Sequence, residues 1–385
     1  MKLELYERLS ESRPASSIFV INGTSGNDRG ITELIDLMGR YGLLFYKSSL
    51  STKNQSPAGL LACDDTVIIK VNCQWDERGG TSTDLLRALI QTIVQHPDRF
   101  VGEIIVADNG QARYGTTGTG GSFNYSKNNA EDASQSIQNV VDSLYDSYRI
   151  STYLWDTITT RRVAEYSEGD EEDGYVIDTK RNPRTGVMVS YPKFRTKFGT
   201  LISFKQGIWD PQTKAYNSSR LKVINMPVLK SHSGFGVTGC VKHYMGVCSD
   251  QLTEELGVRT HSTVGTGGMG TEMVGTRFLT LNIIDAIWIN ANPGEGPRSS
   301  YDVAVQTNVI AGSTDPVALD YWAAKHILLQ ASRSKGYGDT TSMDPDNLVQ
   351  PSFGQWLRLS VNEINRAGYK TTVDESHMNV HVVHV

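Results

Sequence analysis

Residues 66–110, TVIIKVNCQWDERGGTSTDLLRALIQTIVQHPDRFVGEIIVADNG, indicate the fold class most clearly. Two nearly continuous apolar runs, 66–72 and 103–108, flank a segment, 84–95, whose apolar residues recur at helical spacing. Continuous apolar runs are typical of strands that are covered on both faces, as in parallel sheets. The stretch therefore predicts a strand, a helix and a second strand in a parallel arrangement.

The same pattern recurs on both sides of this stretch. An apolar run at 16–24, a helical pattern at 26–42 and a second run at 43–49 predict a β-α-β unit within residues 1–60. Further strands are expected within 221–232, 278–290 and 308–314, and further helices within 239–248 and 315–330. Because strands alternate with helices, we expect an α/β fold: a mostly parallel sheet with helices on both faces, whose main domain comprises 61–110 and 221–385.

Residues 111–220 differ from this pattern. They begin with a Gly/Thr/Asn-rich stretch, contain the acidic run EGDEED at 168–173, and continue with short β-like pieces separated by turn signals. We expect an insertion or a small β-rich subdomain here. The C-terminal tail carries His377, His381 and His384, which one extended strand would divide between its two faces. A polar edge strand or a loose tail is therefore favoured over a metal site.

Composition narrows the classes of partner. The 385 residues carry a formal net charge of -5 with both signs interspersed, which argues against nucleic acid and against an anionic membrane surface. The N-terminal residues are charged where a signal peptide would be apolar, and no apolar run approaches the ~20 residues of a membrane span, so we expect a cytoplasmic protein without a transmembrane segment. The four cysteines form no C-x-x-C pair and are expected to be buried free thiols.

Polar residues follow several of the expected strands at their carboxyl ends, where ligands bind in open α/β sheets. These residues are Lys70 and Asn72, Asp108 and Asn109, Lys230 and His232, and Ser313, Thr314 and Asp315. A lysine inside an apolar strand, such as Lys70, is costly to bury unless it is paired or bound to an anion. We therefore expect Lys70, Asn72 and Asp108 to bind substrate, although Asp108 would also suit a turn and Lys70 could reach solvent at the strand end.

Lys230 and His232 form the strongest candidate pair. Residues two apart on an extended segment point the same way, so the ammonium and the imidazole would face one pocket. Thr238, which we also expect to bind substrate, follows in a Gly-rich loop that lacks the spacing of a Walker phosphate loop. Adjacent residues on the expected helix point about 100° apart, so we expect Lys242 to face the pocket and His243 to face solvent.

Three carboxylates lie in apolar company. Asp315 precedes Pro316 and is explained as a helix N-cap. Asp285, in the expected strand 278–290, and Asp320, in the expected helix 315–330, have no such explanation. Each could ligate a divalent metal, or each could belong to a structural network with the pocket lysines.

Three blocks carry a resemblance to a known family. They are 68–90 with its Lys-x-Asn strand end, 223–247 with a Pro, a Lys-x-His, a Thr, a Lys and a Met-Gly, and the C-terminal block of LNIIDAIW (281–288) and AGSTDPVALD (311–320). Together they resemble domain-of-unknown-function family 362. The resemblance matches Lys70, Asn72, Lys230, His232, Thr238 and Lys242 to the family pattern. It also implies an association with iron-sulfur chemistry, but this chain lacks the closely spaced cysteines of a self-contained cluster.

Three functions remain open at this stage. The first is an enzyme that binds an anionic carboxylate or phosphate, with Lys70, Lys230 and Lys242 holding the anion, His232 as general acid or base, and Asp285 or Asp320 as orienting carboxylate or metal ligand. The second is a redox-associated accessory protein with a separate ferredoxin-type partner. The third is a non-catalytic binding protein that uses residues 111–220.

Overall fold

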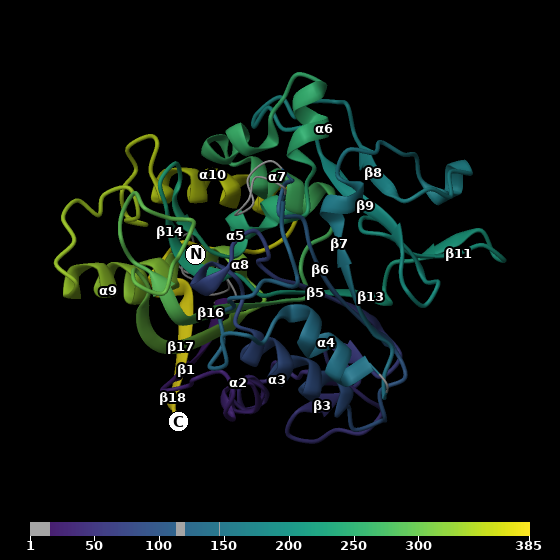
Figure 1. Cartoon of the computed structure of the whole chain (residues 1–385), viewed down its shortest axis with the longest axis horizontal. Helices are drawn as coiled ribbons and strands as arrows, with labels where there is room; N and C mark the ends of the chain where they lie inside the picture. The colour runs from purple at the N-terminus through teal and green to yellow at the C-terminus, as the bar shows by residue number, and fades with distance from the viewer. Residues whose placement is uncertain (1–15, 113–119, 146) are drawn as a thin grey trace, which may run out of the picture.

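A large mixed sheet forms the centre of the protein, as seen in a computed structural model that describes residues 16–112, 120–145 and 147–385 (Figure 1). Its strands follow the order β18 (Met378–His384), β1 (Ser16–Asn22), β17 (Val305–Ser313), β16 (Leu281–Asn290), β13 (Leu221–Asn225), β5 (Thr66–Lys70), β6 (Glu103–Asp108) and β7 (Ile150–Leu154). The hairpin of β14 (Val228–His232) and β15 (Gly236–Thr238) joins this sheet through β16.

The sheet is mostly parallel, which confirms the expected fold class. Neighbours from β16 to β7 run parallel, and β17 is antiparallel to both of its neighbours, β16 and β1. The reversed direction of β17 corrects one expectation. Ser313, Thr314 and Asp315 follow β17 and therefore lie at the edge where the parallel strands begin, so that Asp315 accepts a hydrogen bond from Ser16 at the start of β1.

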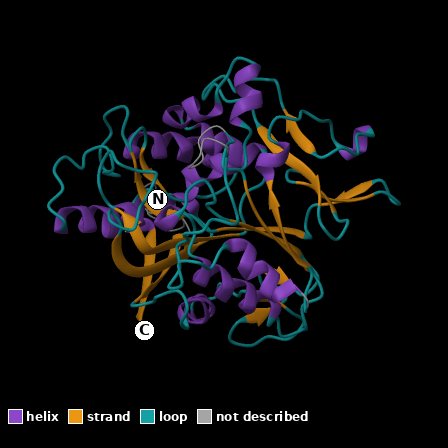
Figure 2. Cartoon of the chain, in the orientation of Figure 1, coloured by secondary structure: helices purple, strands orange, loops and turns teal. Residues whose placement is uncertain are grey.

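Helices cover both faces of the sheet (Figure 2). One face carries α2 (Gly30–Arg40), α3 (Thr83–Val94) and α4 (Ile137–Tyr145); the other carries α5 (Cys240–His243), α7 (Gly268–Gly275), α8 (Pro316–Ala323) and α10 (Phe353–Arg366), with α6 (Asp250–Glu255) and α9 (Leu329–Ser334) at the periphery. Alternate residues of β5 belong to two separate cores: Val67 and Ile69 pack with α3, and Ile68 packs with the opposite layer. Burial on both faces explains the continuous apolar run of this strand.

Two smaller sheets complete the fold. An antiparallel sheet follows the order β12 (Ala215–Asn217), β11 (Gly207–Asp210), β10 (Leu201–Ser203), β9 (Ser190–Arg195) and β8 (Gly174–Ile177), and a short sheet contains β3 (Gln55–Ser56), β2 (Tyr46–Lys47) and β4 (Leu61–Ala62). The antiparallel sheet lies within the segment expected to be β-rich, 111–220, although β7 of that segment belongs to the large sheet and α4 packs against it. Likewise, β1 of the first 60 residues belongs to the large sheet.

N-cap residues in the sequence explain the starts of two helices. The Ser82 hydroxyl accepts a hydrogen bond from Leu85 N at the start of α3, and Asp315 accepts from Val317 N and Ala318 N at the start of α8, as its N-cap pattern predicts. The tail forms the edge strand β18, parallel to β1, and His381 stacks on Tyr41 there. Within the described ranges, no helix is long and apolar enough to cross a membrane.

Candidate functional site

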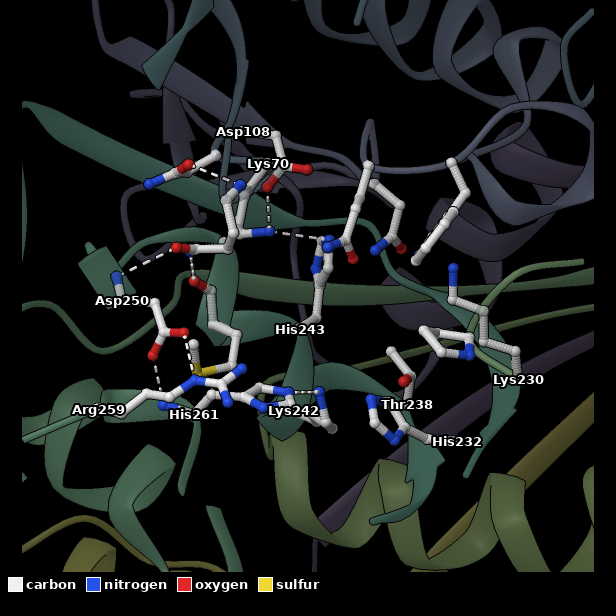
Figure 3. Close-up of a pocket in the computed structure, with 18 residues that line it drawn as sticks. Lys70, Asp108, Lys230, His232, Thr238, Lys242, His243, Asp250, Arg259 and His261 are labelled. Carbon is white, nitrogen blue, oxygen red and sulfur yellow. Dashed lines mark hydrogen bonds and ion pairs between the residues drawn. The ribbon is translucent and has the colours of Figure 1, made fainter. Parts of the chain in front are cut away.

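A cavity of ≈ 430 Å³ lies beyond the carboxyl ends of β5 and β6. Figure 3 shows the side chains that surround it, most of which come from these two strand ends, from the β14–β15 hairpin, from α5 and from the chain that follows α5. The lining comprises Lys70, Asn72, Gln74, Trp75, Asp108, Asn109, Gln111, Lys230, His232, Thr238, Lys242, His243, Met245, Gly246, Asp250, Arg259, His261 and Pro297. The structure thus brings together the seven residues predicted to act in catalysis or substrate binding.

Lys70 and Asp108 form a buried ion pair at one side of the cavity. The Lys70 Nζ lies 2.8 Å from Asp108 Oδ1, and the other carboxylate oxygen of Asp108 accepts a hydrogen bond from Cys73 N at 2.8 Å. The two residues end neighbouring parallel strands, which places their side chains at the same edge. Gly246 packs against the pair so closely that a Cβ atom there would lie 2.1 Å from Asp108 Oδ1. Lys70 is therefore compensated by a carboxylate within the protein.

His243 is buried beside this ion pair, which corrects the expectation that it faces solvent. Its Nε2 lies 2.9 Å from Lys70 Nζ, and its Nδ1 lies 2.7 Å from Asn225 Oδ1. The Asn225 amide nitrogen donates to Cys240 O and Asn282 Oδ1, so its oxygen must accept from Nδ1. This assigns the proton of the neutral imidazole to Nδ1, and Nε2 lies 2.9 Å from both Lys70 Nζ and the carbonyl oxygen of Val71. No residue of α5 faces solvent, because this short helix is buried over its whole length.

The β14–β15 hairpin presents three polar side chains to the cavity. Lys230 pairs in register with Thr238 across the hairpin, and His232 lies two residues beyond Lys230, so all three share one face. The Lys230 Nζ donates to Gly79 O at 2.6 Å, and His232 Nδ1 accepts from Gly234 N at 3.0 Å. The neutral His232 ring therefore carries its proton on Nε2. The buried Thr238 hydroxyl has no hydrogen-bond partner among the described residues.

Lys242 lies on the following short helix, between His261 and the hairpin side chains of Thr238 and His232 (Figure 3). Its Nζ lies 3.3 Å from His261 Nε2 and 5.4 Å from the centre of the Phe235 ring. Nearby, Asp250 binds Arg259 with 3.0 Å between Oδ2 and Nε. In the part of the chain that the structure describes, no carboxylate forms an ion pair with Lys230 or Lys242.

Burial controls the protonation of the groups without a carboxylate partner. Loss of hydration, together with the neighbouring charge of Lys242, lowers the pKa of Lys230 to about 7. Loss of hydration also lowers the pKa of Lys242 to about 7. Burial and the nearby lysines also lower the pKa values of His232 and His243. The histidines are therefore neutral near pH 7, and the two lysines can each exchange a proton there.

Asp285 and Asp320, the predicted metal ligands, do not line the cavity. Asp285 accepts hydrogen bonds from Ser82 N and Ile287 N, whereas Asp320 accepts from Cys240 N at 2.5 Å and Val241 N at 2.9 Å. Backbone donors and, at Asp285, the amide of Asn129 satisfy these carboxylates in place of lysines. Across residues 16–112, 120–145 and 147–385, no group of three or more His, Cys, Asp or Glu side chains could hold a metal ion.

Asp320 is expected to give the folding free energy a distinct dependence on pH. Burial raises its pKa from 3.8 to about 7, so between these values the folded protein keeps a proton that the unfolded chain loses, and stability falls as pH rises. In Asp320→Asn this decrease should be smaller by up to about 1.4 kcal/mol per pH unit. Urea unfolding of the variant and wild type at pH 4.5 to 7 measures the difference, with exposed Asp302→Asn as control. Equal slopes would contradict this assignment.

Several residues of the site had no signal in the sequence. Trp75, Gln111, Asp250, Arg259 and His261 lie in segments without a recognisable motif, and the tertiary fold brings them to the cavity. The nine-residue spacing of the Asp250–Arg259 pair matches no local rule for helices or strands. The four cysteines are free thiols, and Cys73, Cys240 and Cys248 are buried.

Comparison with known families gives one match. Residues 219–325 match the family described as Domain of unknown function (DUF362), and no curated protein matches the chain. The matched segment contains the β14–β15 hairpin, α5 and the Asp250–Arg259 pair, whereas Lys70 and Asp108 lie outside it. The resemblance to domain-of-unknown-function family 362 is therefore confirmed over residues 219–325.

Proposed function

We propose that the chain binds an anionic small molecule, a carboxylate or a phosphate, in the cavity between Lys70, Lys230 and Lys242. The observation that carries the proposal is the pair of buried lysines, Lys230 and Lys242, that face this cavity without a carboxylate partner in the described chain. A buried ammonium group is costly unless an anion compensates it. A bound anion supplies this compensation.

The neutral groups of the cavity support the same proposal. The Nε2–H of His232 is a donor without a protein acceptor in the described residues, and the Thr238 hydroxyl is buried without a partner. Both can donate to the oxygens of a carboxylate or phosphate. The ligand would therefore receive hydrogen bonds from the hairpin in addition to the charge of the lysines.

The geometry also suggests which groups transfer protons if the bound molecule reacts. An acid or base works best when its pKa is close to the operating pH, and this describes Lys230 and Lys242. His232 would act as a hydrogen-bond donor, because its Nδ1 is occupied by Gly234 N. We thus propose an enzyme in which a lysine is the acid or base and His232 polarises the substrate. His261, which contacts Lys242, would position that lysine.

Thermal unfolding in the presence of sulfate, phosphate or succinate tests the binding step, with chloride at equal ionic strength as reference. We expect at least one of the three anions to raise Tm in a saturable manner in wild type, and Lys230→Met to abolish the increase. The matched control is Lys335→Met, which changes an exposed lysine. The proposal fails if no anion raises Tm, or if both variants respond like wild type. Native mass spectrometry of the purified protein would identify a retained anion.

A further inference from the structure

The charges around the cavity divide into paired and unpaired groups. Two cations have carboxylate partners: Lys70 pairs with Asp108 at 2.8 Å, and Arg259 pairs with Asp250 at 3.0 Å. Two others, Lys230 and Lys242, have none among the described residues. The cavity therefore has two uncompensated positive charges when both lysines are protonated.

The two lysines face the same space from adjoining elements. Lys230 lies on β14 with Thr238 opposite it, and Lys242 follows on α5 four residues after Thr238 (Figure 3). Burial lowers the pKa of Lys230 most, and the charge of Lys242 is the next largest cause of this decrease. A ligand with one negative charge would compensate one ammonium group and leave the second buried without a counterion.

We propose that the ligand of this site is a dianion, and that Lys230 and Lys242 take up protons as it binds. This inference rests on the proposed function. A phosphate monoester and a dicarboxylate share the required chemistry, since each presents two negative charges to two ammonium groups. Sulfate, a tetrahedral oxyanion like phosphate, and succinate, a dicarboxylate, distinguish these two possibilities in the experiment below.

Proton uptake follows from the free state of the two lysines. Near their pKa of about 7 each is only partly protonated, and a bound dianion raises the pKa of both. The other charged and titratable groups that face the two lysines do not oppose this proton uptake. Asp108, Asp285 and Asp250 already contribute attraction in the free protein, Lys70 contributes repulsion, and His232 and His261 stay neutral because burial lowers their pKa values.

Calorimetry with charge-matched probes tests the inference on the full chain. Sulfate remains a dianion between pH 6 and 9 and methyl sulfate is its monoanionic counterpart; succinate and succinamate form the same pair for carboxylates. We expect one dianion to bind at least about 10-fold more tightly than its monoanion, because the second charge-assisted contact is lost. Titrations in two buffers of different ionisation enthalpy should show uptake approaching about two protons at pH 8 and fewer at pH 6.

The possible outcomes separate the inference from the proposed function. If monoanion and dianion bind equally and no proton is taken up, the dianion inference is overturned while anion binding stands. If none of the four probes binds, both fail. In Lys242→Met the uptake at pH 8 should fall to about one proton and the preference for the dianion should disappear. Retention of wild-type uptake in this variant would overturn the assignment to Lys242.

Discussion

Replacing Lys242 by methionine is expected to stabilise the ligand-free protein at pH 7 and to weaken binding of the preferred dianion about 10- to 100-fold. The ammonium group is buried, and its contacts to His261 and to the Phe235 ring do not supply a counterion. Methionine keeps most of the apolar stem and removes the charge. Apolar replacement of buried ionic groups stabilises other proteins by about 1–4 kcal/mol, and we expect a gain in that range.

The opposite signs of the two effects distinguish a binding lysine from a structural one. Loss of a structural lysine would instead lower the free energy of unfolding. Urea unfolding without added anion and calorimetric titration with the dianion measure both quantities in one preparation. The same pair of experiments on Lys335→Met, at an exposed position, should change neither. A variant of Lys242 that loses stability and keeps its affinity would refute the proposed role.

The pH dependence of stability provides a second test of the role of Lys242, in the same two proteins. In the unfolded chain a lysine stays protonated up to about pH 10.4, whereas the folded-state pKa of Lys242 is about 7. Between these values the unfolded state binds more protons, so stability of the ligand-free wild type should rise with pH from 7 to 10. The rise should be smaller in Lys242→Met.

Asp108→Asn is expected to lower the free energy of unfolding by about 3–5 kcal/mol, the usual effect of removing one partner of a buried ion pair. Lys70 is fully buried, and Asp108 is the carboxylate that holds it. Asparagine keeps an oxygen that can accept from Cys73 N, so the lost charge dominates the effect. Chemical denaturation at pH 7 measures the cost.

A second variant separates the charge effect from general damage to the site. Lys70→Met combined with Asp108→Asn removes both charges, and we expect it to recover most of the lost stability. Some loss should remain, because Lys70→Met also removes the polar contact between Lys70 Nζ and His243 Nε2. If the double variant is as unstable as Asp108→Asn alone, the ion pair is not the source of the cost.

Burial explains which parts of the fold could be predicted from the sequence. Strands β5 and β6 coincide with apolar runs because both faces of the sheet are covered, and α3 coincides with the helical pattern between them. The direction of β17 could not be predicted, because the same apolar pattern fits either orientation. Nor did the sequence indicate that 221–232 divides into β13 and β14 around Pro227.

The site was predictable where polar residues interrupt apolar runs. Lys70, Lys230 and His232 stand out for this reason, and all three line the cavity. Asp285 and Asp320 stand out in the same way, but backbone N–H groups satisfy them outside the cavity, and the sequence does not distinguish this arrangement from a metal site. The network around Lys242 depends on residues that only the tertiary fold brings near.

The most direct test of anion binding by Lys230 and Lys242 is a crystal structure with selenate, located by its anomalous scattering. Selenate resembles sulfate in shape and charge, so we expect an anomalous peak inside the cavity, with selenate oxygens about 2.7–3.2 Å from both Nζ atoms. The peak should be absent from crystals of Lys230→Met grown in the same way. A cavity without selenate in wild type, at concentrations where sulfate raises Tm, would contradict the account.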